Sequence, residues 1–326
     1  GVRYESGKQR VVPQDVFNAN PGSAFNTPTN IDKDYWLPAA TVTWNFAENM
    51  QFRFSASKTV ARPQFRELAP QPYFDTDSDR LSFGNQFLEN SELINVEGRY
   101  EWYFGRDERL AVGAFYKDID KPIDAIAFVQ GGTFQNTFAN APNARLYGAE
   151  IEAQKYFDLS GWGGLFETRR FFISANYTYT DSQIRVRAGD TTRFPLSGQV
   201  VPATDIFRAG SLPLTGQSDH VANLQFGFQD DAGLSEQTIL FNYASNRVAF
   251  RGPSGQPDLV EKPGIRLDVV IRQGFKIFGK EIEAKLEGRN LTNTRYQEFQ
   301  RLNASRIDTN TYVLGRTFQA SVSAKF

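Results

Sequence analysis

The chain contains 326 residues, and its 36 lysines and arginines against 37 aspartates and glutamates give a formal net charge of −1. This balance produces no single-sign field, so we expect no nucleic-acid partner. No cysteine and only one histidine occur, which excludes thiol catalysis, disulfides and Cys/His zinc sites. No apolar run approaches the roughly 18 residues of a spanning helix, which excludes helical membrane proteins. We predict neither a bound metal nor a cofactor.

Strict two-residue alternation of apolar and polar side chains recurs through most of the chain and is typical of half-buried strands. The last segment is the clearest, because Phe318, Ala320 and Val322 alternate with polar residues. The pattern predicts about twelve strands, at residues 1–11, 39–47, 50–60, 92–104, 109–120, 146–157, 170–181, 219–229, 237–248, 263–275, 280–296 and 310–326.

The links between these strands alternate in length. Short links follow the second, fourth, sixth, eighth and tenth strands. The link after the sixth strand is somewhat longer than the other four. Long polar links fill residues 12–38, 61–91, 121–145, 182–218, 249–262 and 297–309. A sandwich or a propeller has no reason for this parity, whereas outer-membrane barrels combine short periplasmic turns with longer extracellular loops. The links therefore favour an antiparallel transmembrane β-barrel.

The 14% of aromatic residues gather near both ends of the predicted strands. Trp44 and Trp102 lie beside short turns, while Tyr116 and Tyr177 lie near long loops, as two interfacial girdles would place them. The alternative is a soluble β-protein whose rings fill its core. Charged faces on consecutive strands argue against that alternative, because they leave the opposite, apolar face for lipid. The charged face then lines a lumen, which is either an open pore or plugged by another domain.

The chain ends in an aromatic residue, Phe326, and Phe318 lies on the same face of the last strand. This ending resembles the signal by which the barrel assembly machinery recognises outer-membrane barrels. Further stretches resemble the C-terminal barrel half of TonB-dependent outer-membrane receptors, of an alphaproteobacterial or xanthomonad-like branch. They include 54–63, 65–70, 114–119 and 147–152, and above all Asn-Leu-Thr-Asn at 290–293 followed by Tyr296. The stretch from Gly84 departs from the family pattern, because Gln86 and Asn90 stand where prolines are usual.

The resemblance implies a 22-stranded barrel of which residues 1–326 form the C-terminal portion. A plug domain and the TonB box would then lie upstream, and the chain, which starts at Gly1, is expected to lack them. The expected partners are the TonB-ExbB-ExbD energy-transducing complex, the barrel assembly machinery and outer-membrane lipid. The expected function is active uptake of a scarce solute, either a carbohydrate or chelated iron, including siderophores and haem. We expect no enzymatic activity.

Two alternatives remain open at the level of sequence. A phospholipase-type barrel enzyme would use His220, which follows Ser218 and Asp219, as its base; a lone histidine there is more often a surface residue. A passive porin would close with these strands alone. Asp75, Asp77 and Asp79 alternate in the loop at 61–91, but the glycine and glutamate of a calcium loop are missing.

The loop at 61–91 is the main candidate for ligand binding. It combines cationic side chains with rings, which stack on sugars or on aromatic chelators. We predict ligand contacts from Arg62, Arg66, Tyr73, Phe74 and Phe83. Each of these residues has an alternative role in packing the loop against its neighbours.

Overall fold

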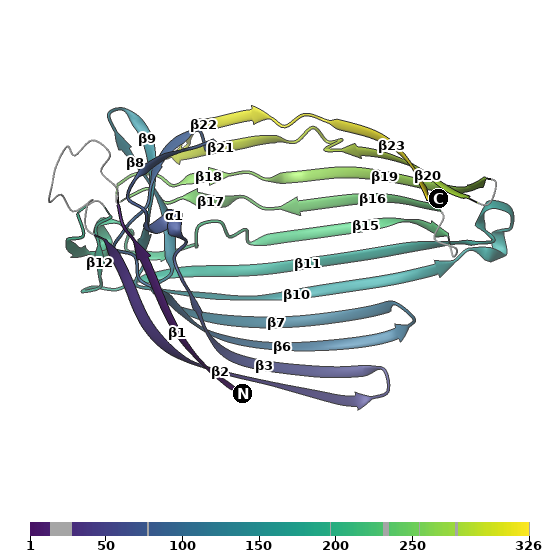
Figure 1. The fold of residues 1–326 in the computed structure, drawn as a ribbon, viewed down its shortest axis with the longest axis horizontal. Helices are drawn as coiled ribbons and strands as arrows, with labels where there is room; N and C mark the ends of the chain where they lie inside the picture. The colour runs from purple at the N-terminus through teal and green to yellow at the C-terminus, as the bar shows by residue number, and fades with distance from the viewer. Residues whose placement is uncertain are drawn as a thin grey trace.

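One curved antiparallel sheet forms the body of the molecule (Figure 1). The structure is a computed structural model and describes residues 1–13, 28–76, 78–195, 197–230, 235–253, 255–277 and 280–325. Twelve of the described strands follow one another across the sheet in sequence order, each hydrogen-bonded to the next. They are β1 (Val2–Val11), β2 (Thr29–Ala47), β3 (Met50–Ala61), β6 (Ser91–Gly105), β7 (Glu108–Asp120), β10 (Asn143–Asp158), β11 (Arg169–Val186), β15 (His220–Asp230), β16 (Ser235–Ala244), β19 (Gly264–Ile277), β20 (Lys280–Arg289) and β23 (Thr317–Lys325). The prediction of about twelve antiparallel strands is confirmed.

The two faces of this sheet carry different side chains, apolar on one face and polar on the other. The pairing register aligns one row of apolar residues across five strands, namely Ala153, Ala175, Leu224, Phe241 and Leu267. The neighbouring row points to the opposite face and contains Glu152, Asn176, Asn223, Asn242 and Arg266. Amide hydrogen bonds of 2.8 and 2.7 Å join the three asparagines of that row. One face is therefore suited to lipid and the other to a polar lumen.

Short turns gather at one end of the sheet and long loops at the other, at the right and left of Figure 1 respectively. Aromatic side chains gather at both ends of the sheet. At the turns, Trp44 packs on Phe46 and Trp102 on Phe104, with centroids 5.5 and 5.0 Å apart. Near the loops, Tyr177 and Tyr179 flank His220. The predicted alternation of links and the two aromatic girdles are both present.

The long loops carry further short strands and helical turns. A four-stranded sheet contains β4 (Pro72–Asp75), β5 (Arg80–Phe83), β9 (Thr133–Asn140) and β8 (Ile123–Gln130); a second contains β17 (Arg247–Phe250), β18 (Leu259–Glu261), β21 (Arg295–Leu302) and β22 (Ser305–Val313). The strands β12 (Thr191–Arg193) and β13 (Val200–Pro202) pair with each other, and β14 (Gly210–Leu212) pairs with β11. The helical segments are α1 (Phe65–Leu68), η2 (Ser160–Trp162), η3 (Gly164–Phe166) and η4 (Ala203–Asp205).

The main buried cluster of apolar side chains lies at the loop end of the molecule. It includes Ile126, Ala139, Ile184 and Phe207, which come from β8, β9, β11 and the segment after η4. The packed core thus holds the long loops together, while the sheet presents its apolar face outward. None of the described helices has the length and apolar character needed to span a membrane.

Three strand boundaries depart most from the sequence prediction, and smaller shifts extend β11 to Val186 and end β16 at Ala244. Strand β2 begins at Thr29 rather than at residue 39, because Thr29–Pro38 pairs with β1 over its whole length. The predicted strand 280–296 ends at Arg289, and Asn290 and Asn293 then adopt positive φ angles of 53° and 55° in a tight turn. The predicted strand 310–326 is divided between β22 and β23 by a break at Gly315, whose φ is 76°.

Candidate functional site

The loop at 61–91 folds as a compact unit beside the end of β3. Gln64 and Glu67 form a reciprocal capping box around α1, in which the Gln64 backbone N–H donates to the Glu67 carboxylate at 2.8 Å. The Gly84 N–H donates to the Ala69 carbonyl at 2.9 Å and closes the loop. A Cβ at position 84 would overlap that carbonyl oxygen, so only glycine fits there.

Three of the predicted ligand residues share one region of this loop. Arg66 lies on α1, while Tyr73 and Phe74 lie on β4, and the Phe74 ring is exposed. Burial raises the pKa of the Tyr73 hydroxyl, whereas the neighbouring Arg66 guanidinium opposes the shift. Arg66 and Tyr73 therefore lie near each other, whereas Phe74, the next residue along β4, points to the opposite face of that strand.

The other two predicted ligand residues have protein partners. Arg62 forms an ion pair of 2.5 Å with Glu5 on β1, and its guanidinium covers Gly7. Phe83 stacks on Phe128 of β8 at 6.5 Å between ring centroids. These contacts join the loop at 61–91 to β1 and to the loop at 121–145.

The predicted assembly signal is only partly covered by the described residues. Phe318 lies on β23 opposite Gly288, and its side chain is exposed. Phe326 falls outside the described residues, as does Asp77 of the alternating aspartates. Within the described ranges, no group of three or more His, Asp or Glu side chains is placed to hold a metal ion.

A buried ion pair joins the loop at 61–91 to strand β21. The Arg80 guanidinium on β5 donates to both carboxylate oxygens of Glu298 on β21, one bond measuring 2.9 Å. Thr309 also donates to Glu298, at 2.7 Å. Phe134 and Phe250 lie under the Arg80 guanidinium at 5.5 and 5.6 Å. Because both charged side chains are almost completely buried, this pair organises the loops rather than presenting charge to a ligand.

A second buried cluster joins three other loops around Arg251. Its side chain is 0% exposed and forms ion pairs of 3.1 Å with Asp124 and with Asp258. It also donates to the Pro213 carbonyl. The Thr215 backbone N–H donates to Asp124 at 3.0 Å. The loops at 121–145, 182–218 and 249–262 therefore meet at one guanidinium.

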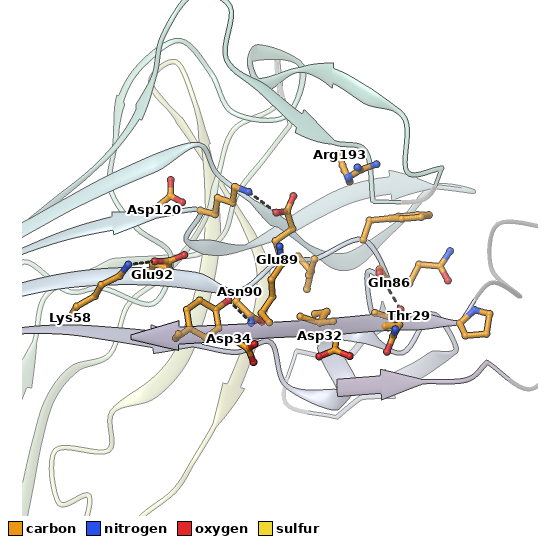
Figure 2. A pocket seen from close by; sticks show the side chains of 18 of the residues that line it. Thr29, Asp32, Asp34, Lys58, Gln86, Glu89, Asn90, Glu92, Asp120 and Arg193 are labelled. Carbon is orange, nitrogen blue, oxygen red and sulfur yellow. Dashed lines mark hydrogen bonds and ion pairs between the residues drawn. The ribbon is translucent and has the colours of Figure 1, made fainter. Parts of the chain in front are cut away.

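A cavity of about 890 Å³ opens between β2 and the ends of β3, β6 and β7 (Figure 2). Its origin is local. The Ala39 N–H donates to the Gly1 carbonyl, toward the β1 side of β2. Neighbouring residues of a strand point their N–H groups to opposite sides, so residue 38 would have to donate toward β3. Proline has no N–H to donate, and the pairing between β2 and β3 ends at Ala39. Beyond that point β2 pairs with β1 alone, which leaves Lys58 of β3 lining a gap instead of a strand. Sequence analysis missed this site, although Pro38 was a usable signal.

Polar and charged side chains dominate the wall of this cavity. Figure 2 shows Lys58 paired with Glu92 at 2.5 Å. Lys121 forms an ion pair of the same length with Glu89. Asn90 is buried and donates to the Tyr35 hydroxyl at 2.8 Å. An adjoining cavity of about 440 Å³ shares four wall residues with the first, namely Phe87, Glu89, Lys121 and Arg193. The two cavities therefore lie next to each other, and we refer to them together as the groove.

His220 lies on the outward face of the sheet, at the start of β15. Its Nδ1 is hydrogen-bonded to the Tyr177 hydroxyl at 2.8 Å, and its ring stacks on that of Tyr177. The neighbouring serine, Ser245, accepts from the His220 backbone N–H rather than contacting the ring. The imidazole is therefore engaged with a girdle tyrosine and not with a serine hydroxyl, which is the arrangement a surface girdle residue would have.

Comparisons with known proteins agree with this architecture. The sequence matches the family described as TonB dependent receptor-like, beta-barrel over residues 1–319. A mutant of the ferric enterobactin receptor PfeA from Pseudomonas aeruginosa superposes with a TM-score of 0.52 at 14% identity, covering 91% of this chain and 41% of that one. The FrpB iron transporter from Neisseria meningitidis gives 0.54 at 15%, covering 90% and 39%. The outer membrane transporter YddB from Escherichia coli gives 0.55 at 9%, covering 92% and 42%.

The chain therefore belongs to the TonB-dependent receptor β-barrel family and is part of an outer-membrane barrel. The sheet described above does not close on itself, since β1 and β23 are its two edges. The chain spans about two fifths of the length of the solved structures that it resembles. No curated protein matches it. The family consists of receptors and transporters rather than enzymes.

Proposed function

We propose that this chain is the C-terminal portion of the barrel of an energy-dependent transporter that takes up a scarce solute. A plug domain and a TonB box lie upstream in the full-length protein, and the TonB-ExbB-ExbD complex supplies the energy. The proposal is supported by the match to the family over residues 1–319, together with the way the long loops pack at one end of the sheet. There, a buried core and two buried ion-pair clusters hold long loops in one arrangement around polar cavities.

Uptake by the full-length protein tests this function. Cells that express it, with and without a deletion of tonB, are given labelled ferric chelates, haem and neutral oligosaccharides. We expect at least one of these solutes to accumulate only when TonB is present. Accumulation that is the same in both strains would support a passive pore instead, and no accumulation at all would remove the proposal.

The ligand is proposed to contact the loop at 61–91 through Arg66, Tyr73 and Phe74, with Arg62 and Phe83 fixing the loop in place. Alanine variants of these residues are compared with His220→Ala for solute binding, uptake and esterase activity. Weaker binding in the loop variants, with His220→Ala unchanged, supports the transporter. Lipid hydrolysis that disappears in His220→Ala would favour the enzyme instead.

The barrel assembly machinery is the proposed partner of the chain end, through Phe318 and Phe326. Deleting Phe326 is expected to reduce the amount of protein in the outer membrane, without changing the ligand affinity of the molecules that do assemble. Membrane fractionation and binding per assembled molecule measure the two effects separately. An unchanged assembled amount would contradict this role.

A further inference from the structure

A small apolar pocket lies among the long loops, at the end of the sheet where β8, β9 and β12 are found (Figure 1). Its volume is about 100 Å³, and the residues that line it differ from those of the groove. Ile126 of β8 and Ile206, which follows η4, are each 3% exposed and form part of its wall. Pro195 and Pro253 also line it, and proline offers no N–H to a ligand. The pocket suits a group of few atoms, since a dry cavity of roughly 150 Å³ holds one benzene ring.

Two phenylalanine rings complete the apolar wall. Phe128 of β8 is held against Phe83, with the two ring centroids 6.5 Å apart. Phe194, directly after β12, lines the pocket and is 40% exposed. The face of an aromatic ring carries negative potential and attracts cations, and cations with apolar substituents are held in this way by groups of rings. The two rings therefore favour a cationic guest over an anionic one.

The one charged residue among those that line the pocket is acidic. Asp205, at the end of η4, lines it and is exposed. Within the described part of the chain, its carboxylate has neither an ion pair nor a hydrogen bond. An anionic ligand would be repelled by this carboxylate, whereas a cation would be attracted.

The cations of the surrounding loops are engaged elsewhere. Arg208 and Arg251 both form ion pairs with Asp258. Arg193, which directly precedes Phe194, lines the groove beside β2. The Asp205 carboxylate therefore keeps an unbalanced negative charge next to an apolar pocket.

We infer that this pocket binds the alkylated ammonium group of a small soluble cation. The alkyl groups contact the apolar wall, the faces of Phe128 and Phe194 attract the charge, and Asp205 balances it. The volume of the pocket admits one such group and no larger segment of a partner protein. The inference goes beyond the proposed function, because binding at this site requires neither TonB nor transport.

The test titrates the full-length protein with choline and follows the N-methyl signal of choline by NMR. The protein is purified in a maltoside detergent, which carries no ammonium group. We expect choline and tetramethylammonium to bind. The neutral alcohol in which a carbon atom replaces the nitrogen of choline has the same shape without the charge, and it should bind about tenfold more weakly or less well still.

Three variants assign the binding to this pocket. Asp205→Asn should lower the affinity for choline about tenfold, close to that of the neutral alcohol. Phe194→Leu keeps the wall apolar but removes a ring face, and it should lower the affinity for choline about threefold. Asp308→Asn is the matched control, because Asp308 is an exposed carboxylate on β22 outside the pocket, and it should leave the affinity unchanged.

Each other outcome contradicts the inference. Absence of binding by both cations, equal affinity for choline and the neutral alcohol, or an unchanged affinity in Asp205→Asn would overturn it. An equal loss in Asp308→Asn would overturn it as well, since binding would then follow the overall charge. Choline binding by a protein that shows no TonB-dependent uptake would leave this inference standing and remove the proposed function. TonB-dependent uptake without choline binding would do the reverse.

Discussion

Arg251 shows how a single side chain can hold several loops together. Its guanidinium is completely buried and contacts carboxylates from two loops and a carbonyl from a third. Burying a charge is costly unless its partners are well placed. Such a residue therefore ties the order of one loop to the order of the others.

Replacing Arg251 by methionine should loosen this junction. Removal of one partner from a buried pair costs about 3–5 kcal/mol, because the other charge is left uncompensated. Hydrogen exchange at the Ala127 amide, which bonds to the Arg251 carbonyl at 2.8 Å, should accelerate about a hundredfold or more.

Two further variants control this result. Arg208→Met removes a more exposed partner of Asp258 and should change exchange by less than about tenfold. Adding Asp124→Asn to Arg251→Met removes the stranded charge but keeps an acceptor for Thr215, so part of the loss should be recovered. Equal exchange in all three variants would show that Arg251 does not organise the loops.

At the scale of the strand, the alternation of apolar and polar side chains determines which residues contact lipid. In β20, Leu286 pairs with Ile271 and Ala320 on the apolar face, whereas Lys285 lies on the lumen face and pairs with Glu287. Leu286→Arg should lower the free energy of unfolding by about 2–4 kcal/mol if the residue lies near the bilayer midplane. Lys285→Gln should cost much less. Urea unfolding of the full-length protein in lipid vesicles measures both, and equal losses would mean that the faces are assigned the wrong way round.

The elements that sequence predicted well are those whose signal is local. Alternation in β6 and β20 depends on residues two apart, so each strand and its faces can be read without knowing its neighbours. The start of β2 was missed because Thr29–Pro38 carries a charged, loop-like sequence and becomes a strand only through its pairing with β1. Tertiary pairing there overrides local preference.

The site was harder to predict than the fold for a related reason. Arg80 and Glu298 are 218 positions apart, and Arg251 and Asp124 are 127 apart. No local sequence pattern therefore predicts either pair. The predicted residues Arg66, Tyr73 and Phe74 do share one region, but whether they bind ligand stays a prediction. Five separate segments line the larger cavity of the groove beside β2, and only Pro38 marked it in the sequence.

At the scale of the whole molecule, the separation of turns from loops predicts which end faces the medium. The sequence contains no cysteine, so single cysteines can be labelled without background. Phe74→Cys and Val129→Cys, at exposed loop positions, should react with an impermeant maleimide on intact cells. Arg106→Cys, in the short turn after β6, should react only after the outer membrane is permeabilised. The opposite pattern would invert the orientation.

The two kinds of ion pair at the loop end should respond differently to ionic strength. Screening shortens the reach of exposed charges from about 8 Å at physiological salt to about 3 Å at 1 M, but affects buried pairs much less. Lys121 and Glu89 at the groove are 43% and 48% exposed, whereas Arg80 and Glu298 are 5% and 0% exposed. Concentrated salt should therefore loosen the wall of the groove while the surrounding scaffold keeps its shape.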